Sequence, residues 1–158
     1  MNTRPVDRWF DAYGESHRNR VNELLHFVCV PVITLCVFSF LSLVPWYLPG
    51  VPSLNLAVLF AGIALGYYLQ LSWRLALALL PVIVLLFQGA DELRHWEAAG
   101  GPAAWLSTLV LFVVAWIGQF IGHAVEGRKP SFLQDLQFLL IGPMWLMGQV
   151  FQRAGWRY

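Results

Sequence analysis

The chain has 158 residues, of which 58% are hydrophobic and 12% are charged, with a formal net charge of +1. Soluble domains carry roughly 25% charged residues, so this composition excludes an ordinary water-soluble domain and predicts an integral membrane protein. The chain also lacks any block of basic residues, which excludes a nucleic-acid-binding protein.

A short amphipathic helix is predicted over residues 4–13, at the start of the chain. Its aromatic residues Trp9, Phe10 and Tyr13 are of the kind that enter the headgroup region of a bilayer. We therefore expect this helix to lie in the membrane surface. The segment around it is polar and does not resemble a cleavable signal peptide, so the first apolar run is expected to remain as an anchor.

Five apolar runs follow, and most approach the length of about 20 residues that crosses a bilayer as a helix. They are Leu24–Val44, Leu54–Leu71, Leu75–Gln88, Ala103–Ile121 and Phe132–Phe151. The runs do not alternate as the strands of a membrane barrel do, so helices are predicted. A polar loop is expected over residues 91–97. The sequence thus predicts an all-α bundle of about five transmembrane helices, forming one multi-pass domain over residues 1–158.

The distribution of basic residues predicts that the N-terminus is cytoplasmic. Five spans would place three arginines, Arg94, Arg153 and Arg157, on the far side. The cytoplasmic side would hold seven basic residues, namely Arg4, Arg8, Arg18, Arg20, Arg74, Arg128 and Lys129. A bacterial inner membrane is the expected location, with the endoplasmic reticulum as the eukaryotic alternative.

Small and aromatic residues give expectations about packing. Cys29 and Cys36 are seven residues apart, about 10 Å along one helix, which is too far for a disulfide. Aromatic residues near the run ends are expected at the membrane–water interfaces, namely Trp46, Tyr47, Trp73 and Trp145. Glycine pairs spaced by four, which either permit close helix approach or arise by chance, are Gly62 with Gly66 and Gly118 with Gly122.

Two histidines lie in a polar segment where the first apolar run begins. His17 and His26 are nine residues apart, so a single straight helix would point them in opposite directions. Both can face one metal ion only if the chain breaks between them, and Ser16, Asn19 and Asn22 are plausible helix caps for such a break. Asn22 and His26 share a helix face.

A second polar cluster, around His123, ends the fourth run. Gln119 precedes this histidine by one turn and Glu126 follows it by three residues, so both side chains can lie beside the imidazole. The five-span topology brings this cluster to the same surface as His17 and His26. His95 falls on the opposite side, in the predicted polar loop, where a surface role is expected. Arg128 and Lys129 are expected to be a positive-inside anchor, with binding of a substrate carboxylate as the alternative.

Polar groups at membrane depth are costly and need a reason. Three histidines with an open coordination position suit zinc hydrolysis, whereas histidines with a carboxylate suit non-haem Fe(II) and oxygen chemistry. The alternative is structural, with the histidines as helix caps or interface residues of a non-enzymatic protein that binds lipid or a partner helix. Ser-His-Asp, CxxC, HExxH and phosphate-loop patterns do not occur.

The two clusters together resemble a known family of small membrane enzymes. The first motif runs from Tyr13 through His17, Asn19, Asn22 and His26 to Pro31. The second runs over 119–131, from Gln119-Phe-Ile-Gly-His123 through Glu126 to Pro130-Ser, and a third stretch covers 135–143. The resemblance is to the membrane 2-hydroxy fatty acid dioxygenases, the family of the yeast enzyme of phytosphingosine breakdown.

This resemblance implies an iron-dependent α-oxidation, in which a 2-hydroxy fatty acid and O2 give the acid one carbon shorter. It implies Fe(2+) as cofactor, with His17, His26 and His123 as metal ligands. Glu126, Asn22 and Gln119 are the further candidates, as a carboxylate ligand or as residues that orient the ligands. The expected partners are the 2-hydroxy fatty acid, O2 and membrane lipid, while the oligomeric state stays open.

Overall fold

The computed structural model describes residues 4–14, 17–44, 46–48, 51–127 and 132–158. Within them the chain forms six helices and one antiparallel two-stranded hairpin. In chain order the elements are α1 Pro5–Gly14, α2 Arg20–Leu43, β1 Tyr47–Leu48, β2 Val51–Asn55, α3 Leu56–Leu71, α4 Trp73–Ala98, α5 Ala104–Glu126 and α6 Phe132–Arg153. The helical fold is confirmed, whereas the hairpin between α2 and α3 was not predicted.

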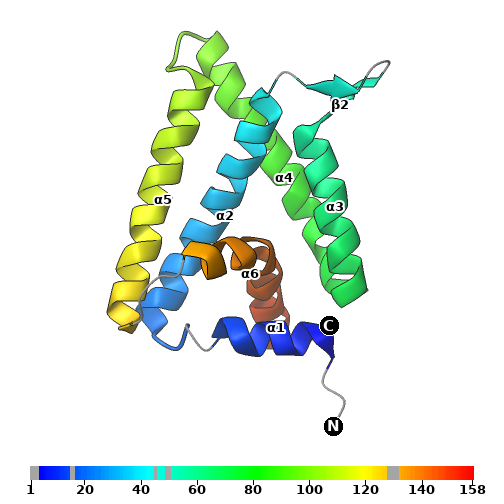
Figure 1. The fold of residues 1–158 in the computed structure, drawn as a ribbon, viewed down its shortest axis with the longest axis vertical. Coiled ribbons are helices and arrows are strands. Elements are labelled where there is room, and N and C mark those ends of the chain that lie inside the picture. The colour runs from blue at the N-terminus through cyan, green and yellow to red at the C-terminus, as the bar shows by residue number, and fades with distance from the viewer. Residues whose placement is uncertain (1–3, 15–16, 45, 49–50, 128–131) are drawn as a thin grey trace.

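Three helices of the described chain are long and apolar enough to cross a membrane, namely α2, α4 and α5. Helix α3 is also apolar but has only 16 residues. Figure 1 shows these four helices running between the same two ends of the molecule, with α1 across one of them. We call that end, which also holds the start of α2 and the end of α5, the α1 end.

Helix α4 is longer than its apolar run indicated. The polar residues 91–97 continue the helix to Ala98, so the predicted loop is wrong. Asp91 forms an ion pair with Arg94 at a spacing of three residues, which supports a helix. The chain turns only at Gly100, whose positive φ of 92° suits glycine.

Helix α1 exists as predicted, but most of its apolar face packs against protein, with Trp9 only partly buried. Val6, Phe10 and Tyr13 are buried in a cluster that includes Met144 and Trp145 of α6. A Cβ on Gly148 would overlap the Phe10 ring, so α6 offers a glycine where this ring packs. An amphipathic pattern does not distinguish burial in lipid from burial against protein, which explains the difference.

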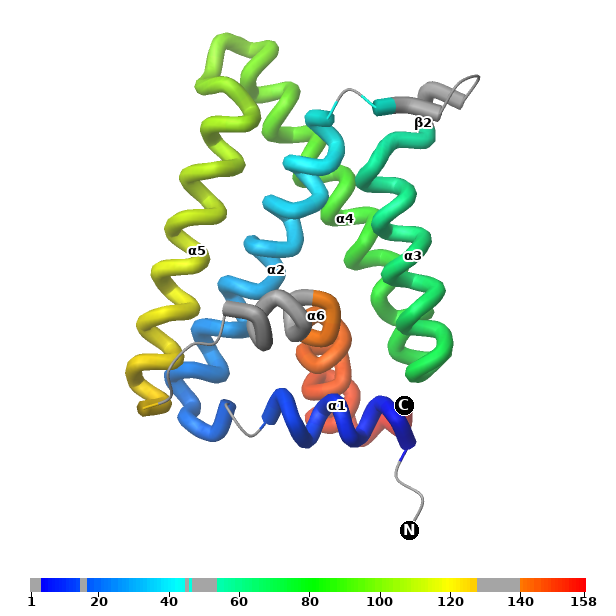
Figure 2. The backbone as a smooth tube through the Cα atoms, in the orientation of Figure 1, coloured from blue at the N-terminus to red at the C-terminus, as the bar shows by residue number. Residues whose placement is uncertain are grey.

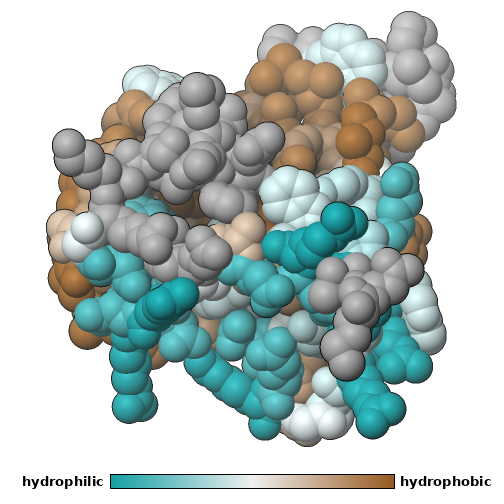
Figure 3. Space-filling model, turned by 60° about the horizontal axis from the view of Figure 1, so that its bottom comes forward, coloured by the Kyte–Doolittle hydropathy of each residue, from teal (hydrophilic) through white to brown (hydrophobic). Residues whose placement is uncertain are grey.

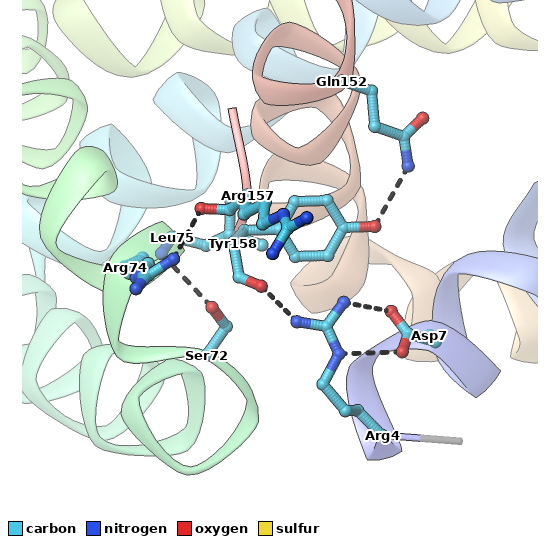
Figure 4. A network of polar contacts seen from close by, with 8 residues as sticks. All are labelled: Arg4, Asp7, Ser72, Arg74, Leu75, Gln152, Arg157 and Tyr158. Carbon is cyan, nitrogen blue, oxygen red and sulfur yellow. Dashed lines mark hydrogen bonds and ion pairs between the residues drawn. The ribbon is translucent and has the colours of Figure 1, made fainter. Parts of the chain in front are cut away.

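The end of the chain returns to the α1 end, as Figure 2 shows. Arg153 of α6 pairs with Glu23 in the first turn of α2. Arg4 donates to the backbone oxygen of Tyr158, and Arg74 donates to that of Arg157 (Figure 4). The five-span prediction, which placed Arg153 and Arg157 at the opposite end, is therefore wrong for this part. The reason is that apolar residues of α6 are buried against α1 and α2, so their hydropathy does not mark a span.

Because both ends of the chain lie at the α1 end, the arginines are concentrated at that end of the molecule. Of the eight arginines in the described part of the chain, only Arg94 lies near the α4–α5 turn, away from the α1 end. Figure 3 views the α1 end and shows hydrophilic residues gathered there, beside the hydrophobic flanks of the helices. Such an excess of arginine favours a cytoplasmic location for this end.

We expect both termini to lie on the cytoplasmic side, with the α4–α5 turn at Gly100 on the other. The reason is that Arg4 and Tyr158 are in contact, so the ends of the chain cannot lie on opposite faces of a bilayer. Compartment-sensitive reporters fused before Met1 and inserted at Gly100 would report opposite sides. A reporter after Tyr158 that agreed with the one at Gly100 would contradict this topology.

Glycines set the distance between α2 and α5. A Cβ on Gly118 would lie 2.6 Å from the Cys29 sulfur, and one on Gly122 would overlap the Asn22 side chain. The close approach predicted for this pair is confirmed. The same prediction is wrong for the glycines of α3, since a Cβ on Gly62 or Gly66 would meet nothing within 4 Å. Both cysteines are buried free thiols, as expected.

Candidate metal centre

A break in the chain brings the first two histidines together. Helix α1 ends at Gly14 and α2 begins at Arg20, so His17 lies in the connection and His26 lies one and a half turns into α2. The Asn19 side chain caps α2 by accepting a hydrogen bond from the Val21 amide at 2.9 Å. The predicted break between the two histidines is confirmed, whereas Ser16, the other candidate cap before α2, lies outside the described residues.

His17, His26 and His123 converge on one point. One ring nitrogen from each lies within 4.8 Å of the other two. The ring centroids of His17 and His26 are 4.1 Å apart, and those of His26 and His123 are 5.2 Å apart. The predicted co-location is confirmed, with one imidazole each from the α1–α2 connection, from α2 and from α5.

Backbone oxygens orient two of these rings. His17 donates from Nδ1 to the Tyr13 carbonyl at 2.6 Å, and His26 donates from Nδ1 to the Asn22 carbonyl at 2.9 Å. Each carbonyl lies four residues before its histidine. A proton on Nδ1 leaves the lone pair on Nε2, which is the usual arrangement of a metal-bound histidine.

The environment of His17 suits a metal ion. Its Nε2 atom is buried, and among the described residues it has no hydrogen-bond partner. Buried polar atoms are almost always paired, and this atom is free to bind a partner from outside the described chain, such as a metal ion. Burial, which disfavours a charged ring, also lowers the pKa of His17 to about 4. The imidazole is therefore neutral at pH 7, the form that binds metals. The donor set fits a divalent metal ion.

Glu126 lies beside the histidines and caps the start of α2. One carboxylate oxygen accepts from the Arg18 amide at 3.1 Å, and the other accepts from the Asn19 amide at 2.8 Å and from the Asn22 side chain at 3.2 Å. A carboxylate is favourable at a helix N-terminus. The cluster of converging donor atoms contains no carboxylate within the described chain.

Asn22 lies between α2 and α5, where it meets Gly122, and Gln119 is a buried side chain of α5. Asn22 is completely buried, and Gln119 is 6% exposed. Asn22 links two parts of the site, because its carbonyl holds His26 and its side chain binds Glu126. Gln119 lies one turn before His123 on α5, as its spacing indicated.

Aromatic rings cover one side of the cluster. Tyr13 stacks on His17 with 4.2 Å between ring centroids and an interplanar angle of 1°. Trp145 lies 5.4 Å from the same histidine and 4.9 Å from Tyr13. Trp145 is 3% exposed, so its assignment to an interfacial belt is wrong. No local pattern identifies this tryptophan as a site residue, because it reaches the site only through the packing of α6 on α1.

His95 lies far from this cluster, near the end of α4, and is exposed. We expect His95→Ala to retain the full metal content of the native protein, because His95 lies in the last turn of α4, and Figure 1 shows that α4 ends at the opposite end of the bundle. Metal analysis of the purified variant would check this. Loss of metal in a folded His95→Ala protein would mean that the site is misplaced. The other predicted surface group, Arg128 and Lys129, lies outside the described residues.

Comparison with known proteins agrees with the motifs. The family model described as Mpo1-like, 2-hydroxy-palmitic acid dioxygenase, matches residues 3–154, which is nearly the whole chain. The chain belongs to this family. The 2-hydroxy-palmitic acid dioxygenase MPO1 of Saccharomyces cerevisiae is 28% identical over 145 residues, covering 90% of this chain and 78% of the yeast protein. No solved structure matches the chain.

Membership of the Mpo1-like family confirms the resemblance seen in the two polar motifs. The family description names a dioxygenase and a 2-hydroxy fatty acid, so it suggests an enzyme of lipid metabolism. The histidine cluster adds a set of three converging imidazole donors that could hold a metal ion.

Proposed function

We propose that this protein is an Fe(II)-dependent membrane dioxygenase in which O2 oxidises a 2-hydroxy fatty acid to the acid one carbon shorter, with the carboxyl carbon released as CO2 and with water as the other product. The proposal is carried by the convergence of His17, His26 and His123 in a chain of the Mpo1-like family. Neutral imidazoles with other coordination positions open are typical of catalytic metal sites.

In this proposal the three histidines hold the iron. When bound, iron supplies the redox chemistry with O2 and acts as a Lewis acid toward the oxygens of the substrate. The Tyr13 and Asn22 carbonyls fix the rings of His17 and His26 so that their Nε2 atoms carry the lone pairs. Pre-oriented ligands of this kind bind metal more tightly than free ones.

The remaining candidates act by positioning. Glu126 joins the end of α5 to the start of α2, and so sets His123 relative to the other two ligands. Asn22 fixes both His26 and this carboxylate, while Gln119 is buried one turn before His123 on α5. We assign these three residues to the support of the ligands, in keeping with the bonds that Glu126 already accepts.

Metal analysis combined with oxygen uptake tests the proposal. Protein purified in detergent should contain about one iron per chain and should consume O2 with 2-hydroxypalmitic acid, releasing the acid one carbon shorter. Palmitic acid, which lacks the hydroxyl group, is the matched control and should give no uptake. If the purified protein folds normally but contains no metal, this result would instead support the hypothesis of a non-enzymatic protein that binds lipid or a partner helix. Bound zinc without oxygen uptake would also contradict the proposal.

A further inference from the structure

An apolar cavity lies among α2, α3, α4 and α6. Its empty volume, which includes space open to its surroundings, is about 490 Å³. Hydrocarbon side chains such as Phe38, Leu79 and Leu86 line it, and among the described residues that line it only Thr34 and Tyr68 carry polar side-chain atoms. The cavity is separate from the histidine cluster, none of whose residues line it.

Both polar groups in this lining are already used within the protein. Thr34 donates its hydroxyl to the Val30 carbonyl at 2.8 Å, and Tyr68 donates to the Leu140 carbonyl at 2.5 Å. The cavity therefore offers a ligand hydrocarbon contacts and no open hydrogen-bonding group. A polar molecule would lose its hydrogen bonds to water there without compensation. An alkyl chain forms no such bonds, so it would enter the cavity without this cost.

The cavity is aligned with the histidine cluster along two helices. On α2, His26, Val30 and Thr34 follow one another at a spacing of four residues, so they share a face. Thr34 is thus about 12 Å from His26 along the helix axis. On α6, a Cβ on Gly142 would lie 3.4 Å from the Tyr13 hydroxyl, and the next residue, Pro143, lines the cavity.

We propose that this cavity receives the hydrocarbon tail of the acid whose polar end lies at the histidine cluster. This inference rests on the proposed function. An amphiphile with its head at the polar α1 end (Figure 3) would extend its tail into the apolar interior of the bundle, which is where the cavity lies. The cavity would then select substrates by chain length.

Small residues on α3 create part of this space. Ala61 and Ala64 both line the cavity and are only 7% exposed, so larger side chains there would project into it. Ile63 lies between them on the same helix, but it is 65% exposed and does not line the cavity. The helix thus offers test and control positions side by side.

The test uses 2-hydroxypalmitic acid with a photoreactive diazirine at its methyl end. Illumination of the native protein should label cavity residues, located by peptide mass spectrometry. Ala64→Phe should lose this label and lower the ratio of kcat/KM for long over short 2-hydroxy acids by about tenfold or more. Ile63→Phe should match the native protein in both measurements. Ala61→Leu, a smaller change, serves if Ala64→Phe does not fold.

The outcomes separate this inference from the proposed function. Cavity labelling without turnover would contradict the iron chemistry while supporting the cavity as the tail site. Turnover with label only outside the cavity, or with unchanged chain-length preference in Ala64→Phe and Ala61→Leu, would overturn the inference alone. Displacement of the label by a diacyl phospholipid, but not by unlabelled 2-hydroxypalmitic acid, would assign the cavity to membrane lipid and also overturn it.

Discussion

Alanine in place of His26 is expected to abolish both iron binding and oxygen uptake with a 2-hydroxy acid. The same result is expected for His17→Ala and His123→Ala. Each imidazole supplies one of the three donors that converge at the site within the described chain, and none of the supporting groups lies in this set of donors. Iron content by mass spectrometry and oxygen consumption by electrode measure the two effects, while elution as a single species in detergent verifies the fold.

A residue next to the cluster provides the comparison for these variants. Gln119→Ala should reduce iron affinity or turnover by only about 10- to 100-fold, which is typical for residues that support metal ligands. An alternative centre, with two histidines and Glu126 as ligands, predicts a different result for these variants. Should only two histidines and Glu126 prove necessary, the centre would be a two-histidine, one-carboxylate iron site. Stoichiometric iron and normal uptake in all three histidine variants would rule out the proposed centre.

Alanine at Gly122 is expected to lower the stability of the protein by a net one to two kcal/mol, to order of magnitude. The added Cβ would overlap the Asn22 side chain, which is buried and bound to Glu126 and therefore has little room to move. Overpacking of this kind costs about 1–3 kcal/mol, while the better helix propensity of alanine offsets up to about 1 kcal/mol. Thermal unfolding in detergent would record the loss.

Gly62→Ala is the matched control for this variant. Gly62 is also helical, but an added Cβ there meets nothing within 4 Å, so the helix propensity of alanine should act alone and leave stability unchanged or raise it by up to about 1 kcal/mol. Equal melting temperatures for the two variants would show that α2 and α5 can separate without cost. Weaker iron binding in Gly122→Ala would further connect this contact to the position of His123.

Sequence reasoning located the histidine cluster because the relevant signals are local. The nine-residue interval between His17 and His26 required a break, and Asn19 is a favoured residue for capping a helix after one. The co-location of His123 followed from an even number of crossings between the first and second motifs. The structure has an even number of helices between the two motifs, since α2 to α5 run alternately between the two ends of the molecule (Figure 1).

Sequence reasoning failed where tertiary partners decide the outcome. The apolar run of α6 has the composition of a span, yet Ile141 and Met144 are buried against protein at the α1 end. The aromatic face of α1 was assigned to lipid for the same reason. Helices α1 and α6 form the two sides of one interface, and the periodicity of each helix does not show which partner covers it. The position of Trp145 at the site depends on this interface, so the sequence alone does not predict it.

The order in which the three histidines leave the ribosome has a consequence for biosynthesis. His17 and His26 are made early, whereas His123 comes 97 residues after His26 and lies near the end of the helical pair α4–α5. A nascent chain that has not yet inserted this pair carries two imidazoles and lacks the third, together with the Glu126 cap of α2. In the proposed enzyme, the full set of three histidines would therefore be available to iron only after α4 and α5 have inserted beside α2.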